Sequence, residues 1–221
     1  MPRRTSPAVT LARCRVPPNR LLPSEDVAGW EDLVGVLADQ KGCESVACSR
    51  VKGDPERVLF AIVWHDQNAL DEFKTSPAYP EFINALPPGV STETIKFEKC
   101  GTKMDFLHGW LSLVTIGFTH PVADVERVLF GHLGGPMRFQ TRGQKPKRGW
   151  VQELRTLGSQ TVQDAVLLRN WRYIVPVLDM QTEVAINPLT EEVFEKRLEE
   201  IGAVQWKEEH VNLARVDGIP M

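Results

Sequence analysis

Two histidines on predicted strands are the clearest candidates for proton-transfer chemistry in this sequence. His210 lies within a predicted strand, where it shares one face with Trp206 and Glu208. His120 ends another predicted strand and directly precedes a proline. An imidazole titrates near neutral pH and can act there as a general base. The alternative for each is a structural or exposed histidine, and the pattern alone leaves both interpretations open.

No known metal or nucleotide motif accompanies these histidines. The sequence contains no HExxH, no Walker loop and no GxSxG. The cysteines form no CxxC pair and fit neither a zinc site nor a dense disulfide framework, which favours buried, reduced thiols. They are Cys14, Cys43, Cys48 and Cys100. We therefore expect neither a metal nor a cofactor.

Composition restricts the partners and the compartment. The 221 residues are 42% hydrophobic and 25% charged, with a formal net charge of -3. This balance provides no global basic field for nucleic acid or an anionic membrane. No apolar run approaches the ~20 residues that a membrane span requires, and no secretory signal is visible. We expect a cytoplasmic protein, a monomer or a homodimer, that binds no nucleic acid and no membrane.

The elements that would position such groups follow a recognisable order in the first half of the chain. Alternating or continuously apolar stretches predict strands, and apolar residues at helical spacing predict helices. Ser24 is a plausible cap for the first helix and Asp66 for the second. Strands are predicted at 9–16, 45–51, 57–64 and 92–99, with helices at 24–42 and 66–86. This order is the βαββαβ pattern of a ferredoxin-like unit.

The second half repeats the order less clearly. A constant offset places Trp64 on Trp171 and Phe60 on Leu167. Strands are predicted at 111–119, 151–157, 165–171 and 206–213, with helices at 122–133 and 190–201. We therefore predict an α+β protein with two ferredoxin-like units, at 8–102 and 108–217. One four-stranded sheet with helices on a single face leaves its other face bare, so the two sheets should close into one intramolecular α/β barrel. The space between them would be a cavity for a small molecule.

The first half also resembles a known family. Its sequence WHDQNAL at 64–70, followed by Phe73 and the segment SPAY at 76–79, is similar to the antibiotic biosynthesis monooxygenase type of dimeric α/β barrel. In that family two chains usually form the barrel, whereas here we expect one chain to provide both halves. The resemblance covers roughly residues 8–100. It implies enzymes of secondary metabolism, including cofactor-free oxygenases, polyketide cyclases and decarboxylases.

The polar groups of the family are carried over unevenly. Some family oxygenases have an asparagine four residues before the strand tryptophan and a tyrosine six residues after it. Here Trp64 is retained, but those positions hold Phe60 and Leu70. The cyclase branch has a histidine base where this chain has Tyr79, and a tyrosine where it has Phe73. A neutral tyrosine is a poor base but can donate a hydrogen bond.

If Trp64 points into the barrel, as the resemblance implies, residues of the same strand parity line the cavity with it. Arg169 would then be the one strong donor from the second half, with Tyr79, His120 and His210 as further catalytic candidates. The predicted substrate-binding set is Val58, Phe60, Ile62, Trp64, Phe73, Leu167 and Trp171. Plain core packing is the alternative for the aromatic residues, and a surface charge is the alternative for Arg169.

Three functions remain open from the sequence. The first is a cofactor-independent enzyme of secondary metabolism that cyclises or isomerises a small apolar substrate of polyketide or terpenoid type, with a pericyclic step as one form of it. Such an enzyme would act mainly by positioning. The second is a cofactor-free monooxygenase of a phenolic or enolic polyketide. The third is a barrel that binds a small molecule without turnover.

Overall fold

The computed structural model describes residues 7–97, 107–133, 147–170 and 188–219. Its strands form one closed antiparallel barrel in the order β1-β3-β2-β8-β5-β7-β6-β4. The strands are β1 (Ala8–Arg15), β2 (Cys43–Val51), β3 (Asp54–Trp64), β4 (Ser91–Phe97), β5 (Gly109–Thr119), β6 (Lys147–Leu157), β7 (Gln160–Asn170) and β8 (Ala203–Arg215). The predicted α+β barrel, closed by a single chain, is confirmed.

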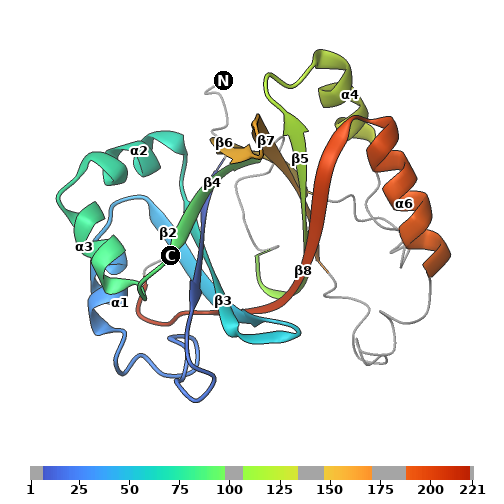
Figure 1. Ribbon diagram of the computed structural model, residues 1–221. Coiled ribbons are helices and arrows are strands. Elements are labelled where there is room, and N and C mark those ends of the chain that lie inside the picture. Colours follow the sequence, from blue (N-terminus) through green and yellow to red (C-terminus); the bar gives the residue numbers. More distant parts are fainter. Residues whose placement is uncertain (1–6, 98–106, 134–146, 171–187, 220–221) are drawn as a thin grey trace.

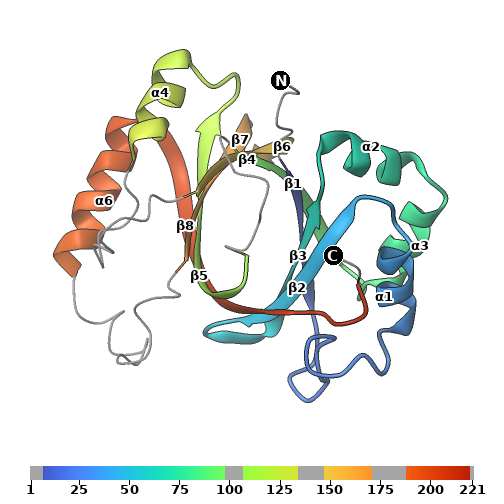
Figure 2. The same ribbon diagram turned by 180° about the vertical axis from the view of Figure 1, so that it is seen from behind.

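Helices cover the outside of the barrel on two opposite sides (Figure 1, Figure 2). The first side carries α1 (Glu31–Ala38), α2 (Gln67–Thr75) and α3 (Ala78–Ala85), and the second carries α4 (Asp124–His132) and α6 (Pro188–Glu200). Two seams join the halves, because β2 pairs with β8 and β4 pairs with β6. No helix among the described residues has both the length and the apolar character needed to cross a bilayer.

The predicted start of the first helix is wrong. The helix begins at Glu31, not near Ser24. Gly29 has φ +80°, a conformation outside the helical region, and it separates the turn at 23–25 from α1. The Trp30 side chain is buried next to this break, and its indole nitrogen donates to the Leu21 carbonyl at 2.9 Å. The second cap is confirmed, since Asp66 Oδ1 accepts a hydrogen bond from the Ala69 backbone nitrogen at 2.9 Å.

Alternate residues of each strand enter different hydrophobic clusters. One cluster lies between the first half of the barrel and α1–α3, and a second lies between the other half and α4 and α6. The third cluster fills the lumen and contains apolar side chains from all eight strands. A hydrophobic core therefore occupies the part of the lumen where the sequence predicted an open cavity.

The predicted lining of the lumen has the wrong orientation. The β3 residues do share one face, but that face packs against the helices, and Leu167 likewise faces α4 and α6. The β3 residues concerned are Val58, Phe60, Ile62 and Trp64. Alternation could not decide between the two faces, because both faces of β3 are buried from Val58 to Trp64. The lumen is lined instead by the intervening residues Leu59, Ala61 and Val63.

Candidate functional site

A group of polar side chains lies on the helix-facing side of the second half of the barrel. Ser112 of β5 lies directly between Arg169 of β7 and His210 of β8 in the strand register. Ser112 has the same parity as Val114 and Ile116, which pack beneath α4 and α6. The register therefore brings two of the predicted catalytic residues, Arg169 and His210, to either side of one serine.

Glu208 completes this group. The Ser112 hydroxyl donates a hydrogen bond to Glu208 Oε1, and His210 Nε2 lies 3.8 Å from the same oxygen. Ser112 is buried, while Glu208 and His210 are 11% and 17% exposed. Burial lowers the pKa of the Arg169 guanidinium, and the nearby Glu208 carboxylate partly offsets this effect. We call Ser112, Arg169, Glu208 and His210 the polar group.

The arrangement has the parts of an acid–base site. A carboxylate beside an imidazole stabilises the protonated ring, so His210 can accept a proton with Glu208 as its partner. A half-buried arginine can stabilise negative charge that develops on a substrate oxygen. Apolar surface adjoins the polar group, because Trp206 lies on the same face of β8 and packs edge-on against Phe194 of α6, with ring centroids 5.3 Å apart.

The equivalent positions in the first half contain no titratable side chain. There Thr10 of β1 lies between Ile62 of β3 and Thr94 of β4, in the same order of strands. Trp64 Nε1 donates to Thr10 Oγ1 at 3.1 Å. The nearest titratable groups there are Lys74 of α2 and Glu153 of β6, which pair with each other at 3.1 Å and both bond to Thr94, so that among the described residues this face has an ion pair but no imidazole.

Aromatic packing fills the first half instead. Trp64 is fully buried and stacks on Phe73 with ring centroids 4.7 Å apart. Tyr79 packs edge-on against Phe73 at 5.6 Å, and Phe60 packs against Trp30 at 5.7 Å. These contacts bring the predicted residues of the first half together as part of a hydrophobic core. Tyr79 is therefore remote from Arg169 and His210, on the opposite side of the barrel.

The remaining predicted residues do not join the polar group. His120 is exposed at the end of β5, and its backbone nitrogen donates to the Thr161 carbonyl at 2.8 Å. Trp171 lies outside the described residues. Sequence reasoning missed Ser112, whose only signal is its place on the helix-facing side of a strand that is otherwise apolar on that side.

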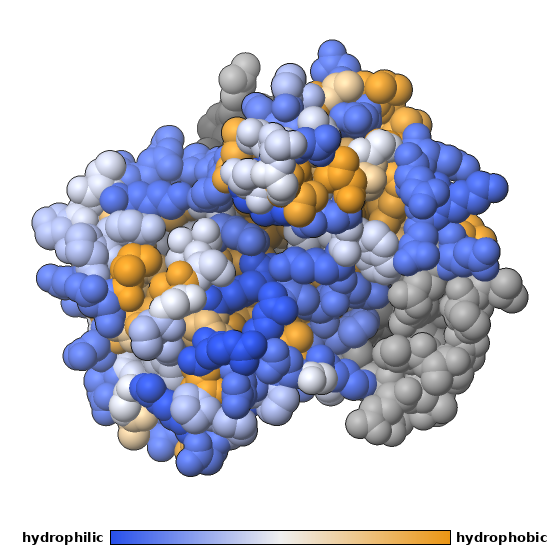
Figure 3. All heavy atoms as spheres, in the orientation of Figure 1, coloured by the Kyte–Doolittle hydropathy of each residue, from blue (hydrophilic) through white to orange (hydrophobic). Residues whose placement is uncertain are grey.

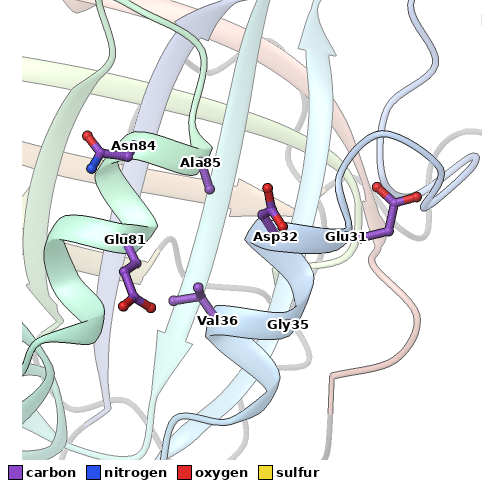
Figure 4. A pocket seen from close by; sticks show the side chains of 7 residues that line it. All are labelled: Glu31, Asp32, Gly35, Val36, Glu81, Asn84 and Ala85. Atoms are coloured by element: carbon purple, nitrogen blue, oxygen red, sulfur yellow. The ribbon is translucent and has the colours of Figure 1, made fainter.

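A surface groove of about 530 Å³ lies between α1 and α3 (Figure 4). Its polar lining includes Asp32, Glu81 and Asn84. Figure 4 shows the carboxylates of Asp32 and Glu81 pointing away from one another, so they do not converge on a common point. The face of the molecule seen in Figure 3 is mainly hydrophilic, with hydrophobic residues gathered near the top and in smaller patches on the left. Neither feature combines an acid, a base and a cation as the polar group does.

Comparison with known proteins finds a family that matches part of the first half. Residues 11–85 match the family described as Antibiotic biosynthesis monooxygenase. This part of the chain, about a third of its length, is therefore similar to that family. The match covers β2, β3 and the helices α1 to α3, together with most of β1. No curated protein matches the chain significantly.

Solved structures match the chain over almost its whole length. A "Putative monooxygenase" from Fusobacterium nucleatum subsp. nucleatum is 10% identical, with a TM-score of 0.51, and the match covers 98% of this chain and 97% of that one. A protein described as anthrone oxidase-like is also 10% identical, with a TM-score of 0.52 and coverage of 95% and 91%. At this level of identity the matches establish a shared fold over both halves of the chain, and nothing about activity.

Proposed function

We propose that this protein is a cofactor-independent monooxygenase that acts on a phenolic or enolic polyketide. The observation that carries the proposal is the polar group, in which Glu208 and Ser112 accompany His210, and Arg169 lies on the adjacent strand. The reaction would take place on the helix-facing side of β5, β7 and β8, and not in the lumen.

The chemistry begins with removal of a proton from the substrate. His210 accepts this proton, and Glu208 stabilises the resulting imidazolium. The substrate becomes an enolate, whose negative oxygen is stabilised by the Arg169 guanidinium. Lowering the pKa of the substrate in this way makes its carbon electron-rich enough to reduce oxygen.

The oxidation can be balanced with molecular oxygen alone. The enolate carbon forms a bond to one oxygen atom and gives a substrate hydroperoxide. The O–O bond then breaks, the substrate carbon becomes a carbonyl, and the second oxygen leaves as water. Four electrons pass from the substrate methylene to one molecule of oxygen, so no other electron donor is required.

The comparisons support oxygenation over cyclisation or isomerisation. The description of the matched family names monooxygenation, and the two solved structures are described with monooxygenase and oxidase names. None of these descriptions names a cyclase or an isomerase. The polar group adds a base and a cation. Both assist the oxygenation of an enol, whereas an enzyme that acts by positioning alone needs neither.

The test measures oxygen uptake with dithranol, a dihydroxyanthrone that enolises readily. We expect the protein to consume oxygen and to form the matching anthraquinone at a rate above the uncatalysed oxidation. His210→Asn should lower kcat by about 10²–10⁴-fold, because it removes a general base. Arg169→Met should lower kcat by about 10²-fold, because it removes the cation that stabilises the enolate.

His65→Asn is the matched control. His65 is 62% exposed and pairs with Glu44 in the first half, at 3.0 Å, so this variant should keep the full rate. Equal rates in His210→Asn, Arg169→Met and His65→Asn would contradict the proposal. So would anthraquinone formation without a matching uptake of oxygen.

A further inference from the structure

One end of the lumen is charged, in contrast to its apolar interior. At this end β1 finishes and β8 begins, and their inward-facing residues include Arg13 and Glu209. Arg13 Nε and Nη2 donate to Glu209 Oε2 at 3.1 and 3.0 Å, and Nη1 lies 2.6 Å from Glu93 Oε2. Since β3 and β2 separate β1 from β8 in the barrel, the Arg13–Glu209 pair crosses the lumen.

Cations outnumber carboxylates in this cluster. Glu209 also pairs with Arg57, whose Nη2 lies 2.8 Å from Oε1, and Lys207 Nζ lies 3.9 Å from Oε2. Arg13, Arg57 and Lys207 together carry three positive charges, while Glu93 and Glu209 carry two negative charges. A separate ion pair, Arg155–Asp164, is bidentate, with N–O distances of 2.6 and 2.7 Å, and its two charges neutralise each other.

The cluster extends from solvent into the lumen. Lys207 and Arg57 are 42% and 35% exposed at the mouth, while Arg13 and Glu209 are 6% and 4% exposed beneath them. A bound molecule can therefore reach the excess positive charge from outside, and its charge would be partly shielded from water once it is there. Charge pairing is stronger in such a site than at an open surface.

Thr115 is a second and independent sign of a site. It lies opposite Lys207 in the β5–β8 register and has the parity of Leu113, so its side chain points into the lumen. Thr115 is 3% exposed, and its hydroxyl has no hydrogen-bond partner among the residues that the structure describes. A buried hydroxyl without a partner costs free energy, which a bound acceptor would recover.

We propose that this end of the lumen binds an oxyanion, a carboxylate or phosphate group, with Lys207, Arg57 and Thr115 as its donors. Ammonium and guanidinium groups form charge-assisted hydrogen bonds with such oxygens, and a threonine hydroxyl can donate a third. Burial lowers the pKa of Lys207, and the positive charge of Arg13 lowers it further, which agrees with a positive local field. This site is separate from the polar group and does not rest on the proposed oxygenation.

The test is thermal unfolding of the full chain in sodium phosphate, sodium acetate and sodium chloride at equal ionic strength. We expect phosphate or acetate to raise Tm above its value in chloride, by mass action on the folded state. Which of the two acts at the lower concentration distinguishes a phosphate site from a carboxylate site. Lys207→Met should weaken the binding at least tenfold, whereas Lys196→Met, which removes an exposed lysine of α6, should not.

Thr115→Val separates a binding role from a structural one. This nearly isosteric change removes the unpaired hydroxyl, so it should keep or raise Tm in chloride while reducing the increase that phosphate or acetate produces. The proposal is overturned if Tm is the same in all three salts. It is also overturned if Lys207→Met and Lys196→Met respond equally to the anions.

Discussion

Glu209→Gln is the most informative single change to the structure of the barrel. Glu209 is 4% exposed and is the common partner of Arg13, Arg57 and Lys207. Glutamine has nearly the same shape, but it removes the negative charge and places an amide donor against guanidinium donors. The change therefore leaves three cations beside one remaining carboxylate, that of Glu93.

The expected cost follows from the burial of the partners. Removing one member of a buried ion pair costs about 3–5 kcal/mol, because the other charge stays buried and unpaired. Arg57 and Lys207 are partly exposed and can turn towards water, while Arg13 stays buried and keeps Glu93 as its partner at 2.6 Å. We therefore expect the lower end, about 3 kcal/mol of unfolding free energy. A urea m-value of about 2–3 kcal/mol/M converts this to a midpoint lowered by about 1–1.5 M.

The assay is urea unfolding followed by circular dichroism, in chloride and again in phosphate. Glu199→Gln, an exposed change on α6, is the matched control and should change the free energy of unfolding by less than about 0.5 kcal/mol. Because Glu209→Gln increases the excess of cations, bound phosphate should restore part of the stability that the variant loses. A cost below about 1 kcal/mol in chloride would refute the view that Glu209 holds these cations in place.

The remaining predictions concern packing and thiol ionisation. Trp64→Phe should destabilise the fold by about 1–3 kcal/mol in urea unfolding, since it leaves the Thr10 hydroxyl without its indole donor; an unchanged midpoint would place Trp64 outside the core. Gly149→Ala should cost about 1–3 kcal/mol, because the added Cβ would lie 2.5 and 2.9 Å from a side chain and a carbonyl of β4. Gly35→Ala in α1 meets nothing within 4 Å and should instead stabilise by up to about 1 kcal/mol; the same sign for both glycine variants would contradict the described packing. Burial raises the pKa of Cys43 to about 12. The folded state therefore favours the protonated thiol. This contribution to stability is fully present below the unfolded thiol pKa of ~8.5 and is lost as the pH rises towards the folded value. Between pH ~8.5 and ~10 the loss is about 2 kcal/mol, and urea titrations should show a smaller loss over this range in Cys43→Ala.

The sequence could predict the order of elements because local patterns determine it. The apolar run of β3 and the Asp66 cap are recognisable within a few residues. The direction of Trp64 could not be predicted, because a strand buried on both faces has no polar side to orient it. The start of α1 was misplaced because acidic residues after Ser24 resemble a first helical turn, while Gly29 ends the turn before the helix forms.

The candidate site was only partly predictable for a similar reason. Glu208 and His210 share a strand face, which alternation alone predicts. Ser112 is 96 residues from Glu208 in the chain, and Arg13 is 196 residues from Glu209. Pairs this distant become neighbours only through the closure of the barrel, and no local pattern encodes them.

A crystal structure of the protein with an anthraquinone bound would test the central claim most directly. We predict that the rings lie on the helix-facing side of β5, β7 and β8, with a ligand oxygen within about 3 Å of Arg169 or His210. Rings bound in the lumen, or in the groove between α1 and α3, would contradict the assignment of the polar group as the active site.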